Sequence, residues 1–276
     1  MDTALMFSLA TLLALGGVAG AAVLLPPRWA ARRQARLRAA PFPAAWRRIL
    51  RRRVPAVARL PWPLRRRLEG HIQVFVADKA FIGSQGQPVD DEVRVTIAAQ
   101  ACLLLLGEAQ PACFPALRQV LVYPGAFVVD RVRPAPGGVV QDQRQVLAGE
   151  SWQQGQVILS WADVRDGAAL PDDGRNVVLH EFAHQIDQHH GGADGRPWRP
   201  GSAARERWDA VMGGLFARLQ VQPSALIGSY AASDMAELFA VLTELFFEQP
   251  LALAHEAPAA YRELAGLYGV DPRAWD

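Results

Sequence analysis

The pattern of apolar and polar positions divides the chain into a helical part followed by a mixed part. Up to residue 107, apolar side chains recur at helical spacing, first in short pieces between prolines and then over 68–82 and 90–106. Beyond that point the pattern changes to short runs of β-branched and aliphatic residues. These runs predict strands at 120–123, 127–129 and 156–161, with a turn at 134–138. The order of elements therefore predicts an α+β fold with a helical N-terminal region.

Two longer helices complete the predicted fold. The apolar run at 177–179 leads into a helix that we expect to end at Gly191, with Asp173 or Asn176 as its N-cap. A second helix begins near Ser233, which the pattern favours as its N-cap. The apolar stripe of this second helix consists of Leu238, Val241, Leu242, Leu245 and Phe246.

The first of these helices contains an H-E-x-x-H motif, formed by His180, Glu181 and His184. Residues four apart lie on one face of a helix, so the two histidines can hold one zinc ion between them. Glu181 then lies where its carboxylate can act as the general base on a water molecule. The alternative is a helix whose histidine and glutamate side chains are merely solvated, but composition alone produces such a match only about once in a hundred.

A zinc peptidase needs a third protein ligand, and two residues compete for that role. His190 lies ten residues after His180, as in the longer H-E-x-x-H-x-x-G-x-x-H motif, but Asp187 replaces the glycine that lets the chain turn. Glu237 lies on the second helix, seven residues before Glu244, so both carboxylates point from one face. A carboxylate on a mostly apolar helix is costly to bury unless it is paired or binds a metal. The alternative is two exposed acids on an amphipathic helix.

Two further segments bear on a substrate cleft. Tyr230 precedes Glu237 by seven residues, close enough to share the cleft and donate its hydroxyl to a developing oxyanion. The strand at 156–161 has two interpretations: an edge strand that pairs with an extended substrate, or an ordinary core strand. The pattern alone does not separate them.

Four segments carry a family resemblance, at 149–152, 155–161, 180–187 and 230–247. Through them the chain resembles the Mlc titration factor A family of zinc-dependent peptidases, from about residue 45 to the C-terminus. The resemblance implies a zincin-like metallopeptidase core, with a mixed sheet beside the H-E-x-x-H helix, similar to that of the anthrax lethal factor protease. It also implies roles for five residues: zinc ligands His180, His184 and Glu237, general base Glu181, and Tyr230 near the transition state.

These implications lead us to expect a zinc-dependent peptidase that hydrolyses bonds of a peptide or protein substrate. The alternative is a membrane-tethered regulatory factor with little or no turnover, because the family name records binding to a sugar-responsive transcriptional repressor. We expect three segments: residues 1–27 as a membrane anchor, 28–115 as an Arg-rich linker and helical region, and 116–276 as the catalytic core.

The anchor is predicted from an uncharged run between Thr3 and Leu25. As a helix these residues rise about 34 Å, enough to cross a hydrocarbon core of about 30 Å. Pro26-Pro27 end the helix and an arginine cluster follows. The positive-inside rule then predicts a single-pass inner-membrane protein with its catalytic domain in the cytoplasm. The alternatives are a signal peptide cleaved after Ala21, and an N-terminal helix buried in a soluble, cytoplasmic protein.

The basic residues are concentrated just after this run. Residues 28–67 contain fourteen arginines and no acidic residue, although the whole chain has a net charge of only +2. The segment lacks aromatic stacking motifs and a known nucleic-acid-binding fold, so no nucleic-acid partner is predicted. We expect it to lie along an anionic lipid surface instead. The two cysteines, Cys102 and Cys113, provide no disulfide framework.

Overall fold

The computed structural model describes residues 29–107, 113–135, 139–147, 149–152 and 155–275. The chain divides into two compact units, Met1–Pro41 and Phe42–Asp276. In the first unit, the described residues form a helix over 29–39. The predicted anchor at 1–27 lies outside the described residues. Within the described ranges, none of the helices combines the length and the apolar character that a membrane span requires.

The second unit begins with a layer of helices: α2 (Ala44–Arg53), the short 3-10 helix η1 (Pro55–Arg59), α3 (Trp62–Asp78) and α4 (Asp91–Leu103). Prolines start η1 and lie in the first turn of α3, where a missing backbone N–H costs little. The carboxylate of Asp90 caps α4 by accepting from the backbone N–H of Val93. Both α2 and α3 pack against α4, whose residues from Val95 to Cys102 are all buried.

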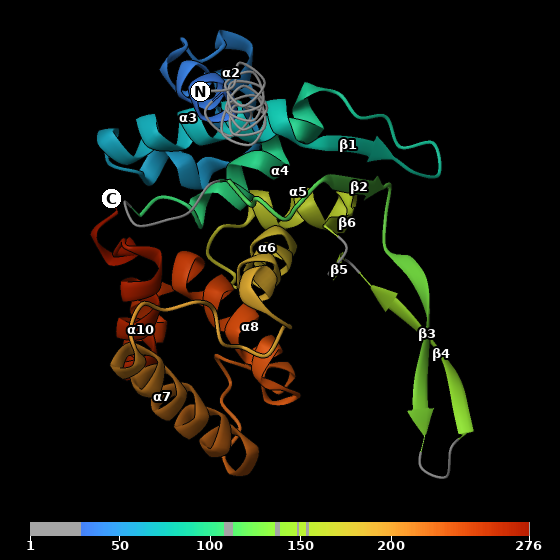
Figure 1. Ribbon diagram of the computed structural model, residues 1–276, viewed down its shortest axis with the longest axis vertical. Helices are drawn as coiled ribbons and strands as arrows, with labels where there is room; N and C mark the ends of the chain where they lie inside the picture. Colours follow the sequence, from blue (N-terminus) through green and yellow to red (C-terminus); the bar gives the residue numbers. More distant parts are fainter. Residues whose placement is uncertain (1–28, 108–112, 136–138, 148, 153–154, 276) are drawn as a thin grey trace, which may run out of the picture. The chain divides into compact units, whose positions relative to one another are not determined.

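A four-stranded sheet follows, in the order β1-β2-β6-β5 (Figure 1). Strands β1 (Ala80–Gly83), β2 (Gln119–Tyr123) and β6 (Gln156–Ser160) are parallel, and β5 (Gly149–Trp152) runs antiparallel to β6. The predicted mixed sheet is therefore confirmed, as is the predicted strand at 120–123. The strand predicted at 156–161 is confirmed up to Ser160, and Trp161 begins helix α5. The sequence predicts a boundary between the helical region and the catalytic core at residue 115. Strand β1 lies before this boundary, and the other three strands of the sheet lie after it.

The helix predicted over 68–82 is wrong at its C-terminal end. Helix α3 ends at Asp78, and the next residues form β1. Ala80 donates its backbone N–H to the carbonyl of Arg118, and Phe81 pairs with Val120 in the parallel ladder. The local pattern of apolar residues does not reveal pairing between segments this distant in the chain. Here the strand pairing overrides the helical pattern.

The strand at 156–161 is a core strand, so its interpretation as a substrate-binding edge is wrong. Strand β6 lies between β2 and β5, and residues Val157 to Ser160 are buried. The edge on that side of the sheet belongs to β5 instead. Outside this sheet, β3 (Phe127–Ala135) pairs with β4 (Val139–Leu147) in an antiparallel ribbon. Strand β3 includes the first part of the turn predicted at 134–138, and residues 136–138 lie outside the described part.

The C-terminal part is helical and surrounds the helix that carries the H-E-x-x-H motif. Helix α6 (Val177–Asp187) packs against α4, α5, α8 and strand β5. On its buried face Phe182 packs against two other aromatic rings. The centroid of its ring lies 5.6 Å from that of Phe75 and 4.7 Å from that of Phe114. The remaining helices are α5 (Trp161–Ala169), α7 (Ser202–Val221), α8 (Met235–Glu248), α9 (Pro250–Glu256) and α10 (Pro258–Tyr268). The fold is mixed α/β, with α6 between the helical layer, the sheet edge and α8.

Candidate metal centre and active site

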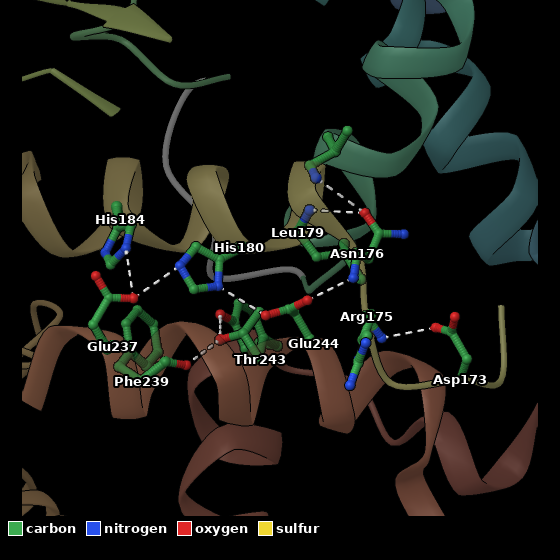
Figure 2. Close-up of polar contacts among 12 residues, drawn as sticks. Asp173, Arg175, Asn176, Leu179, His180, His184, Glu237, Phe239, Thr243 and Glu244 are labelled. Atoms are coloured by element: carbon green, nitrogen blue, oxygen red, sulfur yellow. Dashed lines mark hydrogen bonds and ion pairs between the residues drawn. The ribbon is translucent and has the colours of Figure 1, made fainter. Parts of the chain in front are cut away.

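Helix α6 begins at an N-cap that also reaches into the site. The side-chain oxygen of Asn176 accepts hydrogen bonds from the backbone N–H groups of Val178 and Leu179, each at 3.1 Å (Figure 2). Of the two predicted caps, Asn176 is therefore the one observed. The carboxylate of Asp173 accepts from the backbone N–H of Arg175 at 2.9 Å. The Asn176 cap determines where the first turn of α6 starts, and therefore on which face of the helix its histidines lie.

Helix α8 begins one residue later than predicted. Asp234, not Ser233, is its N-cap, and its carboxylate accepts from the backbone N–H of Glu237 at 2.9 Å. The Ser233 hydroxyl instead donates to the carbonyl of Tyr230 at 2.8 Å. Ser233 has right-handed helical backbone angles as it ends the 3-10 helix η3 (Tyr230–Ala232), whereas an N-cap needs the extended geometry that Asp234 adopts.

The three predicted metal ligands lie together between α6 and α8. Single ligand atoms of His180, His184 and Glu237 all lie within 4.8 Å of one another. Oε2 of Glu237 lies 3.0 Å from Nε2 of His180 and 3.7 Å from Nε2 of His184 (Figure 2). Two imidazole nitrogens and one carboxylate oxygen form the donor set of many catalytic zinc sites. The residues therefore fit a bound metal ion of this type.

A second carboxylate holds the other nitrogen of His180. Oε1 of Glu244 lies 2.8 Å from Nδ1 of His180, and Oε2 of Glu244 accepts from the backbone N–H of Asn176 at 2.5 Å (Figure 2). A proton on Nδ1, donated to Glu244, leaves the lone pair of Nε2 directed at the metal position. Burial lowers the pKa of His180, but the hydrogen bonds to Glu237 and Glu244 outweigh it and hold this pKa well above its ordinary value.

The pKa of Glu237 is shifted in the opposite direction. Burial acts to raise its pKa, but the hydrogen bond with His180 and the ion pair with His184 outweigh burial, so the pKa lies below its ordinary value. The Glu237 carboxylate is therefore ionised, as a metal ligand has to be.

Glu181 is buried beside the three ligands, at the wall of a cavity. Burial raises its pKa to about 7, although the neighbouring histidines act to lower it. Gly149 of strand β5 packs directly against this side chain. A Cβ at position 149 would lie 2.6 Å from Cγ of Glu181 and 2.7 Å from its Oε1. The cavity has a volume of about 480 Å³ and is bordered by β5, α6 and the start of α8. The Glu181 carboxylate thus has room only because residue 149 has no side chain.

Tyr230 lies on the wall of the same cavity. Its ring centroid is 6.0 Å from that of His180, and its side chain is half-exposed. Burial and the negative charge of Glu237 raise its pKa. The hydroxyl therefore stays protonated and able to donate at physiological pH.

The competing ligand His190 ends the 3-10 helix η2 (Gln188–His190), and its side chain is outside the described set. The sharp turn that would direct it to the metal in the longer motif does not occur at Asp187. Asp187 has right-handed helical angles, φ −61° and ψ −46°. Its carboxylate accepts from the backbone N–H of Gly195 at 2.7 Å and so supports the loop after α6.

Three contributors to the site were not recognised in the sequence: Gly149, Asn176 as a partner of α8, and Glu248. Oε1 of Glu248 accepts from the side-chain amide of Asn176 at 2.9 Å. Glu237, Glu244 and Glu248 follow each other at helical spacing, and that periodicity was the available signal. Gly149 had no such signal, because its neighbour is distant in the chain.

Comparison with known proteins agrees with this geometry. Residues 28–269 match the family described as glucose-regulated metallo-peptidase M90. An uncharacterized protein of Synechocystis, slr2042, is 38% identical over 251 residues, 89% of this chain and 91% of its own length. Mlc titration factor A of Cronobacter sakazakii is 34% identical over 85% of this chain and 89% of its own length. The protein of the same name from Enterobacter is 35% identical over 79% and 84%. The chain belongs to the glucose-regulated metallo-peptidase M90 family.

Proposed function

We propose that this protein is a zinc peptidase with a zincin-like core that hydrolyses peptide bonds with Glu181 as general base. The observation that carries the proposal is the convergence of His180, His184 and Glu237 beside a buried carboxylate in one cavity. Membership of a metallopeptidase family supports it. A zinc ion held by these three residues supplies the Lewis acidity that activates water near neutral pH.

The other residues of the cavity have separate tasks. Glu181 takes a proton from the attacking water and passes it to the leaving amine as the carbon–nitrogen bond breaks. The Tyr230 hydroxyl donates a hydrogen bond to the carbonyl oxygen as negative charge develops on it. Glu244 holds the His180 ring by its Nδ1.

Strand β5 is the element suited to bind the substrate backbone. It is an edge strand of the sheet, and its residues Gly149 to Ser151 line the cavity. An extended peptide can add to such an edge through main-chain hydrogen bonds. This arrangement brings a peptide bond alongside Glu181, which Gly149 covers.

A second function rests on the relatives named Mlc titration factor A. That name describes titration of a protein called Mlc, so this chain is a candidate to bind a repressor with little or no turnover. A binding role of this kind does not require the proton transfer by Glu181.

The variant Glu181→Gln separates the two functions, because it replaces the base and leaves the three ligands. Zinc content and hydrolysis of a peptide library are measured on purified wild type, Glu181→Gln and the control Glu206→Gln, an exposed residue on α7. We expect zinc in all three proteins and hydrolysis in wild type and control only. Full hydrolysis by Glu181→Gln would show that the general-base role is wrong. Zinc without hydrolysis in every protein would favour the binding function.

A further inference from the structure

A second cavity lies away from the metal site, among α2, η1 and the start of α3. It has a volume of about 610 Å³ and shares no lining residue with the cavity at Glu181. Its inner surface is formed by Leu50, Val54 and Val57, which are 4%, 2% and 6% exposed. We call it the α2–α3 groove. Its size and apolar lining are those of a small-ligand or lipid-chain site.

Arginines surround this apolar surface. Arg47, Arg51, Arg65 and Arg66 line the groove with one acid, Glu69, so its lining has a net charge of +3. Glu69 forms ion pairs with both Arg47 and Arg66, each at 3.2 Å. Among the described residues, exposed Arg51 has neither a hydrogen-bond nor an ion-pair partner. The groove thus combines an apolar interior with a positive charge, at Arg51, that no described residue pairs with.

An exposed tryptophan borders the groove. Trp62 is 72% exposed, between the exposed prolines Pro61 and Pro63 at the start of α3. A solvent-exposed indole of this size is costly in water and is favoured at the boundary between lipid headgroups and hydrocarbon. Together, the groove and Trp62 present the residue types of a membrane-facing surface: aromatic, arginine and aliphatic.

We propose that the α2–α3 groove docks on an anionic membrane, with an acidic phospholipid as its occupant. The arginines match the charge of the headgroup, Trp62 lies at the headgroup level, and Leu50, Val54 and Val57 contact the acyl chain. The surrounding sequence agrees, because residues 28–67 contain no acid and follow the uncharged run that ends at Leu25. This uncharged run is not a suitable occupant itself, since it offers nothing to pair with the arginines.

Two other ligand classes fit less well. A nucleic acid would satisfy the arginines but has no aliphatic part for the interior of the groove. An acidic amphipathic peptide could satisfy both, but it does not account for an indole flanked by prolines at the rim. The proposal is independent of catalysis, because none of these residues borders the metal site.

The test uses the full chain in nanodiscs of phosphatidylcholine, with or without an equal part of phosphatidylglycerol. A phosphatidylglycerol analogue with a photoreactive acyl chain is added, and labelled peptides are mapped by mass spectrometry. We expect labelling within residues 47–69, reduced by high salt because the headgroup contacts are electrostatic. Site-specific mapping keeps this readout separate from any insertion of the N-terminal run.

Matched variants assign the labelling to the groove. Arg51→Gln should lower it about fivefold, the effect of one arginine near headgroups. Arg48→Gln removes the same charge from the same helix but does not border the groove, so it should lower labelling clearly less than Arg51→Gln does. Ala58→Trp, which fills the groove from an exposed position, should lower labelling without a charge change. Unchanged zinc content and unfolding temperature show that each variant is folded.

Three results would overturn the proposal. One is equal labelling by a phosphatidylcholine analogue, which would mean that charge plays no part. Another is an equal effect of Arg48→Gln and Arg51→Gln, which would mean that the groove is not the site. The last is selective labelling by an acidic amphipathic peptide in place of phosphatidylglycerol, which would assign the groove to a protein partner.

Discussion

Oε1 of Glu244 lies 2.8 Å from Nδ1 of His180, while the other ring nitrogen faces Glu237 at 3.0 Å. One imidazole is therefore held between two carboxylates that lie seven residues apart on α8. The first carboxylate fixes the orientation and tautomer of the ring, and the second completes the proposed metal site. Glu244 is in turn fixed by the backbone N–H of Asn176, so the cap of α6 and the metal site are one connected structure.

Replacing this outer carboxylate should weaken metal binding without abolishing it. We expect Glu244→Gln to lower zinc affinity about 10–100-fold, because the amide no longer polarises the His180 ring. Zinc affinity is measured by competition with a chromophoric chelator, and unfolding of the zinc-free protein shows whether the fold is intact. Exposed Glu206→Gln is the control. An unchanged zinc affinity in Glu244→Gln would mean that the contact only supports packing.

The ligand assignment has its own test, because two residues competed for the third position. We expect about one zinc ion per chain in wild type and in His190→Ala, and almost none in Glu237→Ala, which loses a directly placed carboxylate. Metal content after dialysis, by plasma emission spectrometry, is the measurement. Zinc lost from His190→Ala but retained by Glu237→Ala would reverse the assignment.

The parts of the site that the sequence predicts are those encoded by helical spacing. His180, His184, Glu237 and Glu244 each belong to a helix whose periodicity is visible in the chain, so their shared faces follow from residue numbers alone. The parts that it does not predict depend on pairing between distant segments. Strand β1 forms because Ala80 to Gly83 find β2, and β5 rather than β6 takes the edge position. No local pattern contains that information.

Gly149 is such a distant contact, and it leads to a specific prediction. A methyl group at this position would lie 2.6 Å from Cγ of Glu181, so Gly149→Ala should displace the carboxylate from the cavity wall. We expect zinc content to stay near that of wild type and kcat to fall at least tenfold. Gly125→Ala is the control, because a Cβ there meets nothing within 4 Å. Equal kcat for both variants would mean that Glu181 tolerates the displacement.

Tyr230 tests oxyanion stabilisation separately from metal binding. Tyr230 borders the cavity but is not one of the three clustered ligands. Tyr230→Phe should keep zinc and lose about 10²–10³ in kcat, with a smaller change in KM, since the donor acts mainly in the transition state. Steady-state kinetics on one peptide substrate measure this. A rise in KM with kcat unchanged would indicate a substrate-binding role instead.

The last prediction concerns stability and pH, through the buried carboxyl group of Glu248. Burial raises its pKa to about 8, and the hydrogen bond from Asn176 only partly offsets this. The negative charges of Asp173 and Glu244 act in the same direction as burial. In the unfolded chain a glutamate has a pKa of about 4.3. The folded state therefore holds this proton to a higher pH than the unfolded state does.

The sign follows from that difference in bound protons. Between about pH 4.5 and pH 8 the folded protein binds more protons at this group, so the free energy of unfolding should fall as pH rises. The full effect is on the order of 5 kcal/mol. Glu248→Gln removes the titration and keeps a neutral group of the same shape. We expect the variant to be close to wild type at pH 5 and more stable than wild type at pH 8. Urea unfolding of both zinc-free proteins at the two pH values measures this, with Glu206→Gln as control. A stability difference that is the same at pH 5 and pH 8 would contradict the prediction, because a group with a raised pKa must make that difference depend on pH.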